Sequence, residues 1–264
     1  MKNLGIKFIL LYLFSFFSYC IGFTQEKWKI ADVQVSYMDN LGQYYFLTNN
    51  NSTLIKTDKN GEIIATKESK LLGTIASIDC KHPFKIKVFY PKQGKIQIVD
   101  NTFAVLQEID LRKNIHWSIV DFATTKEDFI ILLDIDSQQW IKVDEYGNGE
   151  PYGIPFDFLD IDWSDFLAFQ IKDNIWSLLF KNEVLLFDNY GGYKSKIPLE
   201  IEGSTKIDAP YFYTYDKGTW IQENLKDFSR KSIDLSIEGS FEGWSVHKNQ
   251  VILHFQEYVE IHKF

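Results

Sequence analysis

The stretch Leu54-Ile55-Lys56-Thr57, followed by Asp58, begins a pattern that the chain repeats up to its C-terminal residues. Each copy is an extended apolar run that ends in a four-residue segment and then a turn-forming residue. The other copies are Ile96-Gln97-Ile98-Val99 before Asp100, Trp140-Ile141-Lys142-Val143 before Asp144, Val184-Leu185-Leu186-Phe187 before Asp188, and two weaker ones, Trp220-Ile221-Gln222-Glu223 before Asn224 and Tyr258-Val259-Glu260-Ile261 before His262. Successive copies start 42, 44, 44, 36 and 38 residues apart. A period near 40 predicts a repeat architecture.

Each repeat holds four strand-like runs. In the first unit, Val33–Tyr37 and Tyr44–Leu47 precede the tetrad and Glu62–Thr66 follows it; in the third unit the expected fourth strand is Tyr152–Phe156. The runs are rich in β-branched and aromatic residues and are bounded by Asn, Asp, Gly and Lys, which is typical of strands and turns. Consecutive apolar positions, as in residues 129–133, predict strands that are buried on both faces.

The turns after the tetrads have a recurring chemistry. Asp58-Lys59-Asn60-Gly61, Asp144-Glu145-Tyr146-Gly147 and Asp188-Asn189-Tyr190-Gly191 place Asp first and Gly fourth. Asp can accept hydrogen bonds from the backbone ahead of it, and Gly tolerates the positive φ that closes a hairpin through a bulge. Asp100 and Asn224 lack this Gly, so we expect their turns to differ. Because the aspartates recur in nearly every unit, we interpret them as structural.

Six four-stranded antiparallel meanders predict an all-β fold, a six-bladed β-propeller. The chain resembles, over the whole mature length, six-bladed propellers of the NHL and TolB-like kind, in which an apolar tetrad, Asp and a nearby Gly mark each blade. The sixth unit ends at Phe264, directly after its third strand, while Lys27-Trp28-Lys29-Ile30 precedes the first unit. We therefore expect an N-terminal strand to complete the last blade and close the ring, which removes two exposed edges.

The N-terminus predicts export. Lys2 and Lys7 precede an apolar run over residues 8–17, and small or polar residues such as Gly22 and Thr24 follow it. This order describes a cleaved secretory signal peptide, and the run is too short to cross a membrane comfortably. No transmembrane helix is expected in the mature chain.

We expect cleavage after Thr24, which gives a signal peptide over residues 1–24 and one propeller domain over residues 25–264. The alternative is lipidation at Cys20, which the bulky Tyr19 disfavours. The Lys-, Asn- and Ile-rich composition is typical of a low-GC, Bacteroidota-like Gram-negative bacterium. We expect a periplasmic or outer-membrane-associated protein, or a secreted one.

Composition limits the partners. The formal net charge is −8, and loss of Lys2 and Lys7 with the signal peptide makes it −10. An acidic surface repels nucleic acid and anionic headgroups. Bidentate capture of phosphate usually uses arginine, and Arg112 and Arg230 lie far apart in sequence. We expect no nucleic-acid partner. Cys80 alone survives removal of the signal peptide, and we interpret it as a small buried hydrophobe rather than a reactive thiol.

Candidate site residues gather on one rim. In a propeller, the loops from second to third strand and from blade to blade share the rim that most often binds ligands. The candidates on it are Asp134, Asp136, Asp160, Asp162, Trp163, Asp165, His116 and Trp117. One interpretation is a cation or sugar site, with Ca²⁺ held by Asp134, Asp160 and Asp162 and a sugar stacked on Trp163. The other is an acidic loop whose aromatic side chains fill the space between two blades.

Two function classes therefore stay open. The first is a non-enzymatic, monomeric scaffold that needs no cofactor and binds an envelope protein, a small ligand or a glycan. The second, which the resemblance to six-bladed lactonases implies, is a metal-dependent lactonase or hydrolase with its site at the mouth of the propeller. No Gly-x-Ser-x-Gly motif is present, which excludes a serine hydrolase of the α/β type.

Overall fold

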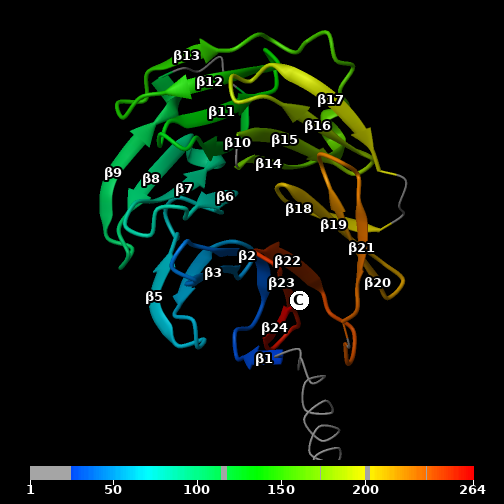
Figure 1. Cartoon of the computed structure of the whole chain (residues 1–264). Coiled ribbons are helices and arrows are strands. Elements are labelled where there is room, and N and C mark those ends of the chain that lie inside the picture. Colours follow the sequence, from blue (N-terminus) through cyan, green and yellow to red (C-terminus); the bar gives the residue numbers. More distant parts are fainter. Residues whose placement is uncertain (1–24, 114–117, 173, 200–202, 236) are drawn as a thin grey trace, which may run out of the picture.

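The chain forms six sheets, each of four antiparallel strands, arranged as a ring around a central axis (Figure 1). The structure is a computed structural model that describes residues 25–113, 118–172, 174–199, 203–235 and 237–264. The predicted all-β, six-bladed propeller is confirmed. The predicted signal peptide lies outside the described residues. Among the described residues, no helix has the length and apolar character that crossing a membrane requires.

In the first five blades the strands follow one another outward from the axis in sequence order. Blade 1 has β2 (Val33–Met38), β3 (Tyr44–Thr48), β4 (Thr53–Thr57) and β5 (Ile63–Glu68); blade 2 has β6 (Ser77–Asp79), β7 (Ile86–Tyr90), β8 (Lys95–Val99) and β9 (Val105–Asp110); blade 3 has β10 (Ile119–Thr124), β11 (Ile130–Asp134), β12 (Gln139–Val143) and β13 (Gly149–Tyr152). Blade 4 has β14 (Phe166–Lys172), β15 (Ile175–Phe180), β16 (Glu183–Phe187) and β17 (Tyr193–Pro198); blade 5 has β18 (Ser204–Asp208), β19 (Tyr211–Asp216), β20 (Thr219–Asn224) and β21 (Arg230–Ile233); blade 6 has β22 (Gly243–His247), β23 (Gln250–His254) and β24 (Val259–Lys263). Short 3-10 turns are η1 (Pro91–Gln93), η2 (Leu111–Lys113) and η3 (Trp163–Asp165).

The N-terminal strand closes the ring, as predicted. β1 (Gln25–Trp28) pairs antiparallel with β24 as the outer strand of blade 6. The strand ends at Trp28, whereas the sequence suggested that it extends to Ile30. The Trp28 ring packs edge-on against Tyr44 of blade 1, with 4.9 Å between ring centroids, and a Cβ on Gly61 would lie only 2.5 Å from Trp28 Cγ. The closing strand is therefore locked against the next blade as well as paired within its own.

The predicted Asp-Gly turns are confirmed. Gly61, Gly147 and Gly191 have φ of 86°, 83° and 78°. In each turn the Oδ1 atom of the first aspartate accepts from the backbone N–H groups two and four residues ahead, as Asp58 does from Asn60 and Glu62 at 2.8 and 2.9 Å. Because the backbone at the fourth position of these three turns has a positive φ, glycine is the favoured residue there.

The prediction that the Asp100 turn differs was wrong. Asp100 accepts from Thr102 and Ala104 as the other aspartates do, and Phe103 takes the left-handed position at φ 67°. Phe103 is almost fully buried in the core between blades 1 and 2, so packing offsets the strain of its backbone. The Asn224 turn does differ: it is one residue longer, with Phe228 at φ 58°.

The fourth strand of blade 3 was placed too late in the sequence. β13 covers Gly149–Tyr152 instead of Tyr152–Phe156, because the tight Asp144 turn returns the chain directly into the strand. Gly153, at φ 72°, then ends the strand. Phe156 leaves the sheet and is buried against Trp140, with 5.0 Å between ring centroids.

Apolar clusters between neighbouring blades form the core. Trp140 of blade 3 contacts Phe169, Trp176 and Phe187 of blade 4, and its Nε1 donates to Gly191 O at 3.0 Å. Cys80 is buried in the equivalent cluster between blades 1 and 2, and burial raises the pKa of its thiol well above the usual value. The interpretation of Cys80 as a buried hydrophobe is confirmed.

Candidate functional site

Antiparallel strands give the ring two distinct faces. The connections from first to second strand and from third to fourth strand lie on one face, which we call the turn face because it carries the turns that begin at Asp58, Asp100, Asp144 and Asp188. The connections from second to third strand and from blade to blade lie on the opposite face, the linker face. The inner strands run from the linker face to the turn face. The candidates from sequence that the structure describes, Asp134, Asp136, Asp160, Asp162, Trp163 and Asp165, belong to the linker face.

Asp134 and Asp136 hold the linker face of blade 3 together. Asp134 is 2% exposed and accepts from Ser118 N at 2.7 Å and from Ser137 Oγ at 2.5 Å. Asp136 accepts from Ser118 Oγ. The two carboxylates therefore fasten the residue that enters β10 to the turn after β11.

The acidic segment between blades 3 and 4 is also engaged locally. Asp162 begins η3 and accepts from Ser164 N and Oγ at 3.0 and 2.7 Å, and these bonds lower the pKa of its carboxyl. Asp165 accepts from Lys181 Nζ at 2.5 Å. Asp160 is exposed.

Trp163 packs with Phe156, Phe166 and Phe180, while its Nε1 atom is buried without a hydrogen-bond partner among the described residues. This packing agrees with the second interpretation from sequence, in which aromatic side chains of the acidic loop fill the space between two blades. His116 and Trp117 lie outside the described residues. No described contact joins the blade 3 carboxylates to those of the segment that follows. Over the described parts of the chain, no group of three His, Cys, Asp or Glu side chains could hold a metal ion.

The middle of the axis carries ionisable groups that the sequence did not indicate. Asp121 on β10 accepts from Ser77 Oγ of blade 2 at 2.6 Å and from Phe169 N of blade 4 at 3.2 Å. Burial raises the pKa of this carboxyl to about 6, although these hydrogen bonds favour the charged form. Asp121 therefore bridges three blades.

Across the ring, His254 joins blades 6 and 1. Its Nε2 atom lies 3.3 Å from Ser245 Oγ and 3.4 Å from Ser36 Oγ, and the ring is fully buried. Burial, with a smaller effect of Lys206, lowers the pKa of His254 to about 3. The two serines are also buried, so this Ser–His group offers no access for a substrate and we interpret it as structural.

At the turn-face end of the axis, polar contacts join the first four blades. Asn40 Nδ2 of blade 1 donates to Lys81 O of blade 2 at 3.0 Å. Lys81 Nζ donates to Thr124 O of blade 3 and to Ile171 O of blade 4, both at 2.8 Å. Asp79 lies 3.4 Å from the same ammonium. One lysine therefore connects three blades.

The chain of contacts then returns to blade 1. Lys172 Nζ of blade 4 pairs with Asp208 of blade 5 at 2.5 Å. Lys248 of blade 6 donates its backbone N–H to Asp208 at 2.9 Å and its Nζ to Asp39 O at 3.2 Å. We call this closed set the axial belt: Asp39, Asn40, Lys81, Lys172, Asp208 and Lys248.

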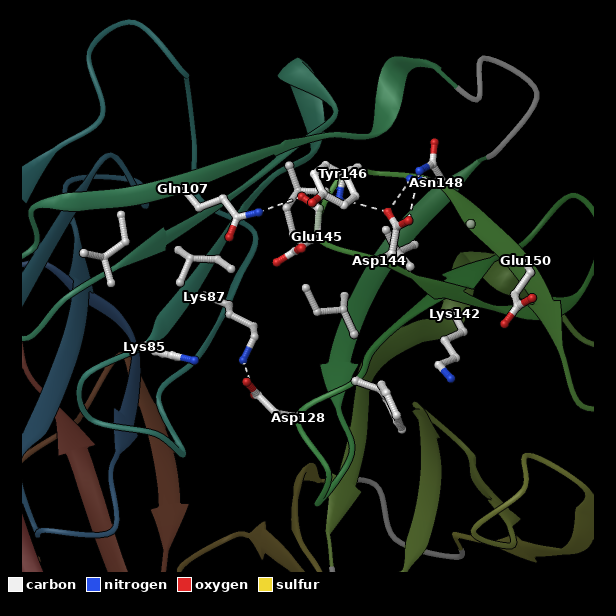
Figure 2. A pocket seen from close by; sticks show the side chains of 17 residues that line it. Lys85, Lys87, Gln107, Asp128, Lys142, Asp144, Glu145, Tyr146, Asn148 and Glu150 are labelled. Atoms are coloured by element: carbon white, nitrogen blue, oxygen red, sulfur yellow. Dashed lines mark hydrogen bonds and ion pairs between the residues drawn. The ribbon is translucent and has the colours of Figure 1, made fainter.

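A groove of about 820 Å³ opens on the turn face between blades 2 and 3 (Figure 2). Leu106 on β9 is 57% exposed and Phe129 before β11 is 46% exposed. The volume lies in the range of ligand-binding pockets. The apolar part of the lining is Ile98, Leu106, Ile109, Phe129, Ile130 and Val143.

Charged side chains surround this apolar surface. Figure 2 shows Lys87 directed at Asp128, with which it forms an ion pair, and Gln107 directed across the groove at Glu145. Gln107 Nε2 donates to Glu145 O at 2.6 Å, and Lys142 Nζ lies 3.7 Å from the centroid of the Phe129 ring. The groove is thus built from both blades.

A second groove, of about 730 Å³, lies on the same face between blades 6 and 1 and includes Trp28, Leu41 and Lys263. Sequence reasoning missed both grooves. One signal was present: Val105 and Leu106 are adjacent apolar residues in an outer strand, where at least one of them must face solvent.

No protein-family model and no curated protein matches the sequence. Solved propellers are similar in fold. Virginiamycin B lyase from Staphylococcus aureus has a TM-score of 0.57 and 9% identity, over 89% of this chain and 81% of that one. The extracellular domain of the BT4673 two component system from B. thetaiotaomicron has a TM-score of 0.55 and 10% identity, over 88% of this chain and 34% of that one. YCF48 bound to D1 peptide has a TM-score of 0.52 and 9% identity, over 91% and 97%. At these identities the likeness establishes the propeller fold alone.

Proposed function

We propose that this protein is an exported, non-enzymatic propeller, akin to the NHL and TolB-like group, that binds an extended segment of a partner protein in the cell envelope. The observation that carries the proposal is the groove between blades 2 and 3, where Leu106 and Phe129 stay exposed beside an outer strand. Exposed apolar side chains in a shaped groove are typical of protein-binding sites.

The outer strand specifies the form of the partner. β9 pairs with β8 along one edge, and the described strands include no partner for its other edge. An extended peptide can add to such an edge through main-chain hydrogen bonds, while its side chains enter neighbouring pockets. A segment on β9 would place apolar side chains over Leu106 and Phe129. Lys85 and Glu150, which also line the groove, would select the charges beside them.

Two comparisons support this proposal. YCF48 has a similar ring of blades and its structure contains a peptide. The similar domain of the BT4673 system is extracellular, which agrees with export. A metal-dependent hydrolase, with Ca²⁺ at Asp134, Asp160 and Asp162, has no comparable support in the geometry. A rise in melting temperature on adding calcium would favour that alternative.

A phage-displayed peptide library tests the proposed function. We expect the wild-type protein to enrich peptides with spaced apolar residues, and Leu106→Glu to bind them at least about ten-fold more weakly, because it places a charge on the apolar floor. Leu71→Glu is the matched control, since Leu71 is 92% exposed on the linker face. Peptides that bind both variants equally well would show that the groove is not the site.

A further inference from the structure

The inner strand of blade 5 carries two polar side chains on the side that faces blade 6. Ser204 and Lys206 are exposed, whereas Thr205 and Ile207 are buried on the other side of β18. Ile207 belongs to the cluster with blade 4, while Trp244 Nε1 of blade 6 donates to Ser204 Oγ at 2.5 Å. Alternation along the strand therefore places Lys206 on the same side as Ser204.

Lys206 differs from the three lysines at the turn-face end of the axis. Lys81, Lys172 and Lys248 each donate to a carboxylate or carbonyl oxygen of another blade. Among the residues that the structure describes, no hydrogen bond or ion pair reaches Lys206 Nζ. Surrounding protein lowers the pKa of this amine, and no nearby carboxylate raises it. The Asp121 carboxylate does not compensate the charge of Lys206 either, because neither group shifts the pKa of the other.

Ser204 supplies a second donor. Its Oγ atom accepts from Trp244, so the hydroxyl hydrogen is available, and no described acceptor receives it. Residues two apart on one side of a strand lie roughly 7 Å apart, which a ligand of a few heavy atoms can span. His254 is close enough for Lys206 to lower its pKa, but with a pKa of about 3 it is neutral and adds no charge.

We infer that Lys206 and Ser204 form an axial binding site for a small organic carboxylate, which enters from the linker face. One uncompensated ammonium and one hydroxyl match the single charge and two oxygens of a carboxylate. A phosphate would require more donors, commonly an arginine fork or a helix N-terminus. Neither surrounds Lys206, since Arg112 and Arg230 lie on or beside outer strands and no α-helix occurs in the described residues.

Isothermal titration with acetate, D-glucuronate and inorganic phosphate, at constant ionic strength, tests this site. We expect a carboxylate to bind the wild-type protein, and Lys206→Met to weaken that binding at least about ten-fold through loss of a charge-assisted hydrogen bond. Lys206→Arg should retain binding within about three-fold. The matched control is Lys226→Met, which removes an exposed lysine of the same blade on the turn face.

Circular dichroism confirms that each variant is folded before titration. Unchanged carboxylate affinity in Lys206→Met overturns the site, as does a wild-type protein that binds neither carboxylate. Tighter binding of phosphate than of both carboxylates overturns the assigned ligand class. The peptide-binding test at Leu106 is independent of all three results.

Discussion

The two parts of the axis compensate their charges in opposite ways. At the turn-face end, the axial belt pairs each lysine with an oxygen of a neighbouring blade. Halfway along, Lys206 and Asp121 lie on separate blades and neither compensates the other. Paired charges hold elements together, whereas the exposed Lys206 keeps its charge available for a ligand. The comparison assigns stability to the belt and ligand binding to the middle of the axis.

The largest expected effect comes from His254 in the middle of the axis. The pKa of His254 in the folded protein, about 3, lies below its value in the unfolded chain. Between these two pKa values the unfolded chain binds a proton that the native state does not bind. Stability should be full above about pH 6.5 and should fall by about 4 kcal/mol as pH decreases to 3. Urea unfolding at several pH values measures this loss. His254→Gln should flatten the curve, and a variant with the wild-type slope would contradict the assignment.

The second largest change in stability is expected from the axial belt. Asp208→Ala should lower the free energy of unfolding by about 3–4 kcal/mol, since it leaves Lys172 and the Lys248 N–H without their acceptor. The control is Asp160→Ala, which removes an exposed carboxylate from the linker face and should leave unfolding unchanged. Equal effects of the two substitutions would remove the distinction between belt and rim.

The contribution of Asp121 to stability should depend on pH in the opposite direction from that of His254. The folded pKa of Asp121, about 6, lies above the unfolded value, so the native state keeps a proton that the unfolded chain has lost. The contribution is present below about pH 4 and is lost, by about 2–3 kcal/mol, as pH rises through 6. Asp121→Asn should therefore show a steeper gain of stability between pH 4 and 6 than the wild type. Parallel curves for the two proteins would contradict this prediction.

The smallest effect is expected on the linker face. Asp162→Ala removes the acceptor of two hydrogen bonds at the start of η3, a three-residue turn. The melting temperature should decrease by about 2 °C or less, as differential scanning calorimetry can show. A much larger decrease would mean that the acidic segment supports the blades as the belt does.

The repeat made most of the fold predictable, because each tetrad and its turn carry local chemistry. Strand order, blade number and the turns of Asp58, Asp144 and Asp188 follow from it. The Asp100 turn was missed because burial of Phe103 in a neighbouring cluster, not its intrinsic preference, selects its backbone conformation.

The belt and groove were not predicted because each contact crosses between blades. Lys172 and Asp208 are one repeat apart in sequence, and this spacing does not predict how close their side chains lie in the folded protein. One usable signal exists: charged residues Asp39, Lys81, Lys172 and Lys248 stand at or just after the end of an inner strand in four units. Aligning the units on their inner strands, in addition to the tetrads, would have revealed it.

The pairing of β1 with β24 affects how fast the ring can form. The two strands join residues more than 230 positions apart, such as Gln25 and His262. Blades 1 to 5 can assemble from neighbouring segments, but blade 6 must wait until β24 has been made and has met β1. Contacts of such long sequence separation slow folding. We therefore expect a long-lived open ring, with β1 and the edge of β24 exposed, to be the stage at which this protein is most open to proteolysis and to aggregation.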